Sequence, residues 1–494
     1  MAMTFSKLTL PLIALATLTQ FANCQSCPGV DCKFGQSVKT TSGVILGHPG
    51  PQGPNVTEYL GIPYASPPIG QLRFSAPVNN CLAKGGDLPP YPGETPQAPK
   101  ILHALLSSYG TQGEDCLRLN IWAKPDPSKL KPVLIWIHGG RFVITNSETP
   151  FYEGQTLASE HDVILVTINY RLNIFGFSGA PGLTQNVGLL DQRMAFEWVH
   201  ENIAAFGGDP DRIVIFGSSA GGTSVDLYSY AWADDPLVSG LISHSGTALS
   251  YLPSTPEQAA GVFFQASKLL GCGDDTANSE QVVQCMREQP FEALFNASNN
   301  VPLTPTVTIP EPVFHAVVDD VVVFSDYKKR SAEGKFARLP YLVTCNNNEA
   351  GFYRATAYSL NITISDAAWD EFNLAAFTCP SGQVVRDRVS HGVPAWQSRY
   401  FGDWDNMRLY PGSGAYHVSD VAMILGNTAR ISGLPDNQTE IEISRYMASA
   451  WVAFASDPYD GLEKFGWPKY NASGEFVFFL NDVSNCINPE QRKH

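Results

Sequence analysis

The chain has 494 residues, of which 44% are hydrophobic and 16% are charged, a composition typical of a globular protein and unlike that of a disordered one. Its formal net charge is −15, and an acidic surface repels nucleic-acid phosphates and anionic lipids. These properties argue against a nucleic-acid-binding protein.

The first 24 residues are predicted to be a secretory signal peptide. Lys7 supplies the positive charge, and residues 8–18 form an apolar run too short to span a bilayer. An N-terminal hydrophobic strand is the alternative interpretation of this segment. Cleavage is expected near residues 22–24. We therefore expect residues 25–494 to be secreted as one domain, and no later stretch or lipid-anchor tail predicts a stable membrane anchor.

Cysteines and sequons fit an oxidising, secretory environment. The chain has ten cysteines, and no matching Cys or His pairs lie at zinc-ligand spacing, so disulfides are expected and neither a metal nor a cofactor is. Five Asn-x-Ser/Thr sequons are expected to be N-glycosylation acceptors: Asn55, Asn296, Asn361, Asn437 and Asn471.

The central part of the chain predicts an α/β fold. Residues 47–100 are rich in Pro and Gly and are expected to be irregular surface loop. Residues 189–206 repeat their apolar side chains at helical spacing and end at a Gly-Gly pair. Apolar, β-branched runs indicate buried parallel strands at 133–137, 163–168, 213–216 and 339–344. Alternating strands and helices indicate an open, mostly parallel sheet covered by helices, and no linker divides it.

Residues 217–221 form the pentapeptide G-S-S-A-G between a predicted strand and a helical stretch. A sharp turn there lifts the central serine out of the sheet, and the glycines leave room for close backbone approach. The helix N-terminus also offers N–H groups to a developing negative charge. Because the motif stands in the context that it requires, Ser219 is predicted to be a nucleophile and not part of a simple Gly/Ser-rich turn.

A serine nucleophile needs a base, and on this fold the acid and then the histidine follow the serine in the chain. Glu349 is favoured as the acid because its loop directly follows the predicted strand 339–344. Asp319 and Asp320 are the other candidates for the acid. The alternative for each of the three residues is a surface carboxylate without a catalytic role.

His417 is favoured as the base because its Gly-rich loop follows the strand-like residues 395–401. A structural histidine remains the alternative on position alone. The other histidines that follow Ser219 within the chain are less well placed, namely His244, His315 and His391.

An oxyanion hole is also required. Residues 138–142 (H-G-G-R-F) follow a predicted strand and resemble the H-G-G-x turn that donates backbone N–H groups on this fold. The expected donors are the N–H groups of Gly140, Arg141 and Ala220.

These motifs together resemble the type-B carboxylesterase family, which includes cholinesterases and some fungal lipases. Residues 114–122 (E-D-C-L-R-L-N-I-W) and 206–212 (F-G-G-D-P-D-R) are similar to its two signatures, and residues 169–172, 186–192 and 414–420 match as well. The resemblance implies an α/β-hydrolase fold.

The resemblance also implies site residues. It places the nucleophile on Ser219, the acid on Glu349 and the base on His417. It implies the disulfides Cys81–Cys116 and Cys272–Cys285, and it leaves open the pairing of Cys27, Cys32, Cys345, Cys379 and Cys486.

Departures from the family pattern bear on the substrate. Ser218 stands where the family usually has Glu, and Arg141 replaces the third oxyanion glycine, so the site is less negative than usual. No Trp lies between Cys81 and Cys116, which argues against choline esters. Residues 101–106 are expected to form only one short apolar turn, which weakens a lipase interpretation.

The sequence therefore predicts a secreted serine carboxylic ester hydrolase that acts on a small to medium, neutral or acidic ester. A triacylglycerol lipase or sterol esterase and an acyltransferase with the same triad are alternatives. A non-catalytic adhesion protein on the same fold is the alternative from another class. The expected partner is a small-molecule ester, and the oligomeric state is left open.

Overall fold

The computed structural model describes residues 37–51, 55–77, 94–106, 112–124, 126, 128–250, 252–302, 312–471 and 478–480. The predicted signal peptide with its cleavage region lies outside these residues, and so do Cys27, Cys32, Cys81 and Cys486.

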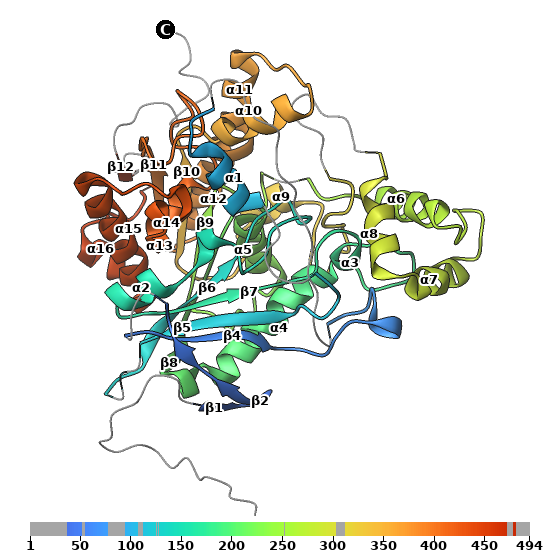
Figure 1. Cartoon of the computed structure of the whole chain (residues 1–494), viewed down its shortest axis with the longest axis horizontal. Coiled ribbons are helices and arrows are strands. Elements are labelled where there is room, and N and C mark those ends of the chain that lie inside the picture. Colours follow the sequence, from blue (N-terminus) through green and yellow to red (C-terminus); the bar gives the residue numbers. More distant parts are fainter. Residues whose placement is uncertain are drawn as a thin grey trace, which may run out of the picture.

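Ten strands of the described residues form one sheet in the order β12-β11-β10-β9-β8-β6-β7-β5-β4-β3 (Figure 1). From β12 to β7 all neighbours pair in parallel, and β5, β4 and β3 add an antiparallel edge. The predicted mostly parallel sheet is confirmed. The strands are β3 (His48–Pro49), β4 (Thr57–Pro63), β5 (Arg118–Ala123), β6 (Lys131–Ile137), β7 (Ile164–Ile168), β8 (Gly208–Ser218), β9 (Gly240–His244), β10 (Tyr341–Asn346), β11 (Ala395–Tyr400) and β12 (Phe478–Leu480). A separate hairpin pairs β1 (Ser37–Thr40) with β2 (Gly43–Leu46).

Helices cover both faces of the sheet because its central strands are apolar on both sides. Val133 and Ile135 of β6 pack with α4 (Val187–Asn202), α5 (Ala220–Ala231) and α12 (Cys379–Ser390). Leu134 and Trp136, which point the other way, pack with α2 (Gln155–Glu160), α13 (Ser419–Leu425) and α15 (Gln438–Ser456). None of the helices in the described part of the chain is long and apolar enough to cross a membrane.

The remaining helices form the periphery and the rim of the sheet. They are α1 (Ala98–Leu106), α3 (Asn173–Gly176), α6 (Pro256–Leu269), α7 (Ser279–Glu288), α8 (Phe291–Asn299), α9 (Tyr327–Ala332), α10 (Ala350–Ser359), α11 (Asp366–Phe372), α14 (Thr428–Ser432) and α16 (Gly461–Phe465). Shorter helical segments are η1 (Gly70–Leu72), η2 (Pro150–Tyr152), η3 (Ile203–Phe206) and the π-helix η4 (Asn373–Thr378).

The expectation that residues 47–100 are irregular loop is wrong for part of the 47–51, 55–77 and 94–100 stretches that the structure describes. This segment contains β3, β4, η1 and the start of α1. Gly61 has a φ of 68°, and the pairing of β4 with β5 shifts register between Tyr59 and Ile62. This irregularity breaks the period-two pattern by which a strand is recognised in sequence.

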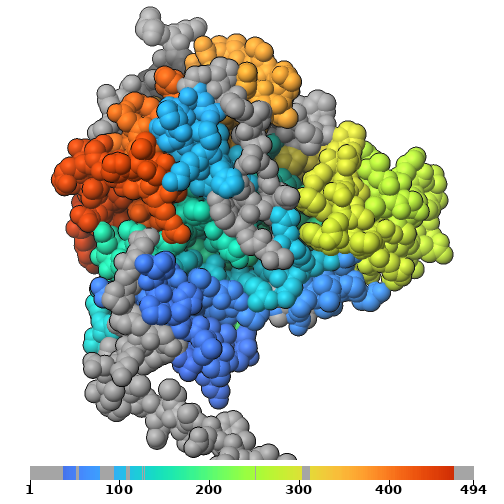
Figure 2. Space-filling model, viewed as in Figure 1, coloured from blue at the N-terminus to red at the C-terminus, as the bar shows by residue number. Residues whose placement is uncertain are grey.

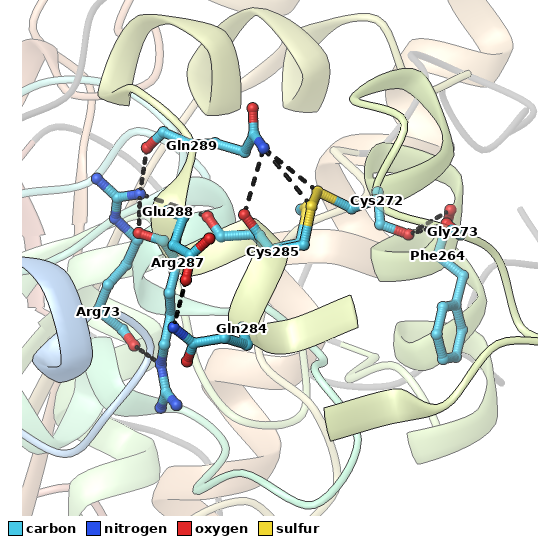
Figure 3. Close-up of a disulfide and its surroundings, with 11 residues drawn as sticks. Arg73, Phe264, Cys272, Gly273, Gln284, Cys285, Arg287, Glu288 and Gln289 are labelled. Atoms are coloured by element: carbon cyan, nitrogen blue, oxygen red, sulfur yellow. Dashed lines mark hydrogen bonds between the residues drawn. A yellow bond between two sulfur atoms is a disulfide. The ribbon is translucent and has the colours of Figure 1, made fainter. Parts of the chain in front are cut away.

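Helices α6, α7 and α8 make a lobe with its own apolar cluster, which stands out at one side of the molecule (Figure 2). The Cys272–Cys285 disulfide joins the loop after α6 to α7, with an S–S distance of 2.06 Å. Beside it, the Arg73 guanidinium donates to the carbonyls of Arg287, at 2.9 Å, and Gln289, at 2.5 Å (Figure 3). A cation there satisfies the orphan carbonyls at the C-terminus of α7.

We expect a Cys272→Ser/Cys285→Ser double variant to lose about 3 kcal/mol of unfolding free energy, because the bond closes a short loop in the unfolded chain. The two cysteines are 13 residues apart. No described residue of α6 to α8 lines the cavities at Ser219, so kcat of the folded variant should not change. Urea denaturation gives the comparison, and an unchanged midpoint would contradict the expectation.

Candidate active site

Ser219 occupies a strained turn between β8 and α5. Its φ and ψ are 60° and −123°, a region that residues other than glycine rarely occupy. Its N–H donates to the His244 carbonyl at 2.9 Å, and its own carbonyl accepts from the Thr223 N–H at 2.8 Å. The backbone on both sides is thereby fixed, and the turn presents Ser219 at the N-terminus of α5, as a nucleophile elbow requires.

Glu349 and His417 lie together, fully buried. His417 Nδ1 lies 2.6 Å from Glu349 Oε2. The other carboxylate oxygen, Oε1, accepts from the Ser245 hydroxyl and the Asn346 N–H, each at 2.6 Å. Because Oε1 is occupied by two donors, Oε2 is the oxygen that accepts from Nδ1–H of His417, and this tautomer leaves the imidazole lone pair on Nε2.

His417 Nε2 is buried and has no hydrogen-bond partner among the residues that the structure describes. Ser219 and His417 line the same cavity. Aromatic rings enclose the imidazole, with centroids 5.0 Å away for Tyr353, 5.2 Å for Phe377 and 6.4 Å for Phe352. Two of them come from α10 and one from the π-helix η4, a type of irregularity that is frequent at functional sites.

The loop after β6 packs directly against Ser219. A Cβ on Gly139 would lie 2.6 Å from the Ser218 carbonyl and 3.0 Å from Ser219 Cβ, so only glycine permits this approach. Gly140, Arg141 and Phe142 all have positive φ, and Gly140 has no room for a Cβ beside the Ile144 carbonyl. Gly140 and Arg141 line the same cavity as Ser219, and Ala220 is the first residue of α5.

His138 supports this loop from behind. Its ring stacks on Tyr170 with centroids 4.4 Å apart, and the Tyr170 hydroxyl donates to the His138 carbonyl at 2.8 Å. Nδ1 lies 2.9 Å from Thr145 Oγ1. Burial lowers the pKa of His138 from 6.5 to about 4, because the charged ring would lose its hydration.

This burial predicts acid sensitivity. The unfolded chain takes up the His138 proton below its ordinary pKa of 6.5, whereas the folded chain does so only near 4. The neutral, buried His138 therefore contributes its full share of the unfolding free energy above pH 6.5. This share, about 2–3 kcal/mol, is lost as the pH falls towards about 4. A His138→Gln variant should lose less stability between about pH 7.5 and about pH 4.5 than the parent protein, measured by urea denaturation.

Thr145→Ser is the control, because it keeps both His138 and the hydroxyl that lies 2.9 Å from His138 Nδ1. It should lose as much unfolding free energy on acidification as the parent protein. Equal acid-induced losses in the parent protein and in His138→Gln would contradict the assigned role of His138.

Two cavities flank Ser219, and Arg141 lines both. The larger has a volume of about 130 Å³, and its walls combine aromatic rings with hydroxyl and imidazole groups, including Phe142, Thr223, Ser250, His315, Phe372 and Phe377. The smaller has a volume of about 50 Å³ and is mainly apolar, with Leu105, Leu106, Ile144, Phe352 and His417 in its walls. The site therefore offers a larger compartment with hydroxyl and imidazole groups among its aromatic rings and a smaller one with almost entirely apolar walls.

The structure brings Ser219, Glu349 and His417 together and gives their rivals other partners. The Asp319 carboxylate accepts from the backbone N–H groups of residues 321–323 and organises its own turn. His391 Nδ1 lies 2.8 Å from the Asp387 carbonyl, His315 lines the larger cavity, and Asp320 is exposed. The sequence did not reveal Ser245 and Asn346 as partners of Glu349, although both lie at the ends of apolar strands.

One of the two predicted disulfides and all five sequon asparagines lie among the described residues. Cys272 and Cys285 are bonded, whereas Cys81 lies outside the described residues and its predicted partner Cys116 is buried. Four sequon asparagines are exposed and Asn471 is half-buried, the exposed ones being Asn55, Asn296, Asn361 and Asn437.

Comparisons with known proteins identify the family of this chain. Residues 35–373, which include Ser219 and Glu349, match the profile of the Carboxylesterase family. The chain is 32% identical to Secreted lipase 5 of Gibberella zeae, over 89% of this chain and 88% of that protein. It is 34% identical to a chlorogenic acid esterase of Aspergillus niger, over 86% and 84% of the two chains. It is 30% identical to a para-nitrobenzyl esterase of Bacillus subtilis, over 89% and 94%. The chain therefore belongs to the carboxylesterase family and is a carboxylic ester hydrolase with an α/β-hydrolase fold.

Proposed function

We propose that this chain is a secreted serine carboxylesterase that hydrolyses small to medium, neutral or acidic esters through an acyl-enzyme on Ser219. The observation that carries the proposal is the Glu349–His417 pair, at 2.6 Å, in which His417 lines the same cavity as Ser219 and its Nε2 has no hydrogen-bond partner among the described residues. Mechanistically, that arrangement makes His417 a base for the serine hydroxyl.

The reaction follows from the placement of these groups. Ser219 Oγ attacks the ester carbonyl as His417 Nε2 takes its proton, and Glu349 stabilises the imidazolium. The N–H groups of Gly140, Arg141 and Ala220 are the proposed donors to the oxyanion. His417 then protonates the leaving alkoxide, and the alcohol departs. Water, deprotonated by the same nitrogen, attacks the acyl-enzyme; the bond from the acyl carbon to Ser219 Oγ then breaks, Oγ takes the proton back from His417, and the acid departs.

This proton path assigns the two cavities. The leaving alkoxide must lie near His417, which lines only the smaller cavity of the two, so that cavity is the alcohol site. The acyl group then occupies the larger one, where Phe142, Phe372 and Phe377 offer ring faces and Thr223 and Ser250 offer hydroxyls. Such walls fit an aromatic acyl group that carries polar substituents. The relative named chlorogenic acid esterase supports an ester of this class.

An ester panel tests the proposal. With a constant alcohol, kcat/KM for a hydroxyaryl acyl group is expected to exceed that for a long saturated acyl chain by about tenfold or more. Acyl transfer to a competing alcohol is measured in the same panel by product analysis. A preference for long-chain acyl groups at submicellar concentration would contradict the assignment of the larger cavity.

A lipase is the second candidate, and helix α1 favours it. Its nine residues exceed the short turn expected from sequence, and Ala98, Ile101, Leu102, Ala104, Leu105 and Leu106 are buried. Leu105 and Leu106 reach the smaller cavity, so this helix provides an aliphatic wall beside the nucleophile. A sharp rise of activity on emulsified triacylglycerol above its solubility limit would favour the lipase over the esterase.

Secretion and glycosylation belong to the same proposal. The apolar run after Lys7, the Secreted lipase 5 relative and the Cys272–Cys285 disulfide support export into an oxidising compartment. Asn437 illustrates how a sequon fits the fold, since its Oδ1 caps α15 by accepting from the Glu440 N–H at 3.0 Å. Glycosylation uses Nδ2 and leaves that cap in place.

A further inference from the structure

Close to the triad lies a second imidazole–carboxylate pair that the proposed mechanism does not use. His244 Nδ1 and Asp420 Oδ2 are 2.8 Å apart, and the two side chains are 0% and 1% exposed. His244 ends β9, where Ser218 on β8 and Thr344 on β10 are its neighbours in register. Asp420 lies in the first turn of α13, three residues after His417.

The protonation state of this pair follows from its third member, Trp451. The indole Nε1 donates to His244 Nε2 at 3.0 Å. An indole N–H can only donate, so Nε2 accepts and the ring proton of His244 must lie on Nδ1, from which it is donated to Asp420. The pair is therefore a neutral imidazole and a carboxylate. The imidazole lone pair, on Nε2, already accepts the Trp451 N–H. His244 cannot serve as a second base.

Asp420 connects the His244 imidazole to the segments that carry Glu349 and His417. Its Oδ1 accepts from Asn346 Nδ2 at 3.1 Å, and the same amide donates to the Tyr416 carbonyl at 2.7 Å. The Asn346 N–H binds Glu349 Oε1 at 2.6 Å. Asn346 thus holds the carboxylate of Glu349 through its backbone N–H and the backbone directly before His417 through its side-chain amide.

The same cluster reaches the nucleophile. The His244 carbonyl accepts the Ser219 N–H at 2.9 Å, so the residue whose ring is fixed by Asp420 also fixes the strained elbow. His244, Asn346 and Asp420 therefore contact all three segments that carry the triad. Their side chains are buried, and hydrogen bonds fix both ring nitrogens of His244, the amide nitrogen of Asn346 and both carboxylate oxygens of Asp420.

We propose that Asp420 is a positioning residue that, through His244 and Asn346, holds Ser219, Glu349 and His417 in their mutual arrangement. This inference rests on the proposed function of the triad. Misplacement of reacting groups by about 1 Å lowers rates by about 100-fold, so loss of this cluster should appear mainly in kcat.

Asp420→Asn is a sharp test because both groups that face the carboxylate are donors, namely His244 Nδ1–H and Asn346 Nδ2. An amide at position 420 must turn its own NH₂ towards one of them. Towards His244, it forces the ring proton onto Nε2, against the Trp451 N–H. Towards Asn346, it forces that amide to turn its oxygen against the Tyr416 carbonyl. Each outcome sets two donors or two acceptors against each other inside the cluster that holds the triad.

The double variant Asp420→Asn/Trp451→Phe should relieve the conflict. Without the indole N–H, His244 is able to carry its proton on Nε2 and accept from the new amide at Nδ1. We expect kcat of Asp420→Asn to fall by about 100-fold with KM changed by less than about threefold, and the double variant to regain about tenfold of that loss. If the two substitutions only disturbed packing independently, their losses of kcat would multiply and the double variant would be slower than the single one.

The measurement is kcat per active site, with sites counted by a fluorophosphonate, so that unfolded protein does not enter the result. Asp387→Asn is the matched control, since this carboxylate on α12 accepts from Ser331 at 2.6 Å and Gln383 at 2.7 Å and contacts no triad segment. It should keep the parent kcat.

Unchanged kcat per site in folded Asp420→Asn would overturn the proposal, and so would a double variant slower than the single one. If Asp420→Asn does not fold, Asn346→Ala decides, because it removes the same amide contacts and retains the backbone N–H to Glu349. Its kcat must fall with KM retained, and an unchanged kcat overturns the inference. Failure of the proposed function is distinguishable, since the parent protein would then not be labelled at Ser219.

Discussion

Replacement of Ser219 by alanine is expected to lower kcat for ester hydrolysis by about 10⁴–10⁶-fold, because no acyl-enzyme can form without the hydroxyl. Residual turnover would come from the oxyanion hole acting on water. The fold should persist, since the elbow is held by backbone hydrogen bonds from Ser219 N–H to His244 and from Thr223 N–H to Ser219. Initial rates on a chromogenic ester, with the urea midpoint of both proteins, provide the measurement.

The neighbouring serine is a matched control. Ser218 is 1% exposed, and its hydroxyl has no hydrogen-bond partner among the described residues. Successive side chains of a strand point to opposite faces, so Ser218 and Gly217 face opposite sides of β8. Ser218→Ala should therefore retain kcat within about threefold, as expected for the loss of a hydroxyl without a partner. Equal losses in the two alanine variants would show that the turn, and not the Ser219 hydroxyl, is required.

Glu349→Gln is expected to lower kcat by about 10⁴-fold while keeping the shape of the side chain. Oε1 accepts from Ser245 and Asn346, so the amide oxygen must take that place and the NH₂ must face His417 Nδ1. His417 then accepts at Nδ1 and carries its proton on Nε2. In that tautomer the imidazole cannot take a proton from Ser219.

Asp320→Asn is the control for this second variant, because Asp320 is an exposed carboxylate with a left-handed φ of 54° that asparagine tolerates well. It should keep the parent kcat. A Glu349→Gln enzyme with more than about a tenth of parent activity would contradict the tautomer argument.

The elements around the nucleophile were predictable because their signals are local. Strand β8, the turn at Ser219 and helix α5 follow one another in a single stretch of chain, and hydrophobic runs identified β6, β7 and β10. Glu349 and His417 were reached through strand-end loops and the family resemblance, because no local pattern distinguishes them from other acidic residues and histidines. Strand β4, in the antiparallel part of the sheet, was missed, since the irregularity at Gly61 disrupts its alternation.

The surroundings of the triad were not predictable, because they depend on register and packing between distant segments. Ser245 meets Glu349 across 104 residues of sequence, and His244 meets Asp420 across 176. The aromatic rings around His417 come from α10 and a π-helix, whose sequence resembles that of ordinary helix. Helix α1 was expected to be a short turn. Its nine residues are helical because its apolar face is buried against other parts of the fold, and that burial cannot be read from the local sequence.

The most direct test of the central claim is covalent labelling of the folded protein with a fluorophosphonate, followed by peptide mass spectrometry. We expect one adduct per molecule on the peptide that contains Ser219, loss of esterase activity in proportion to labelling, and no adduct in Ser219→Ala. An adduct on another residue that accompanies the loss of activity, or full activity after Ser219 is labelled, would contradict the central claim.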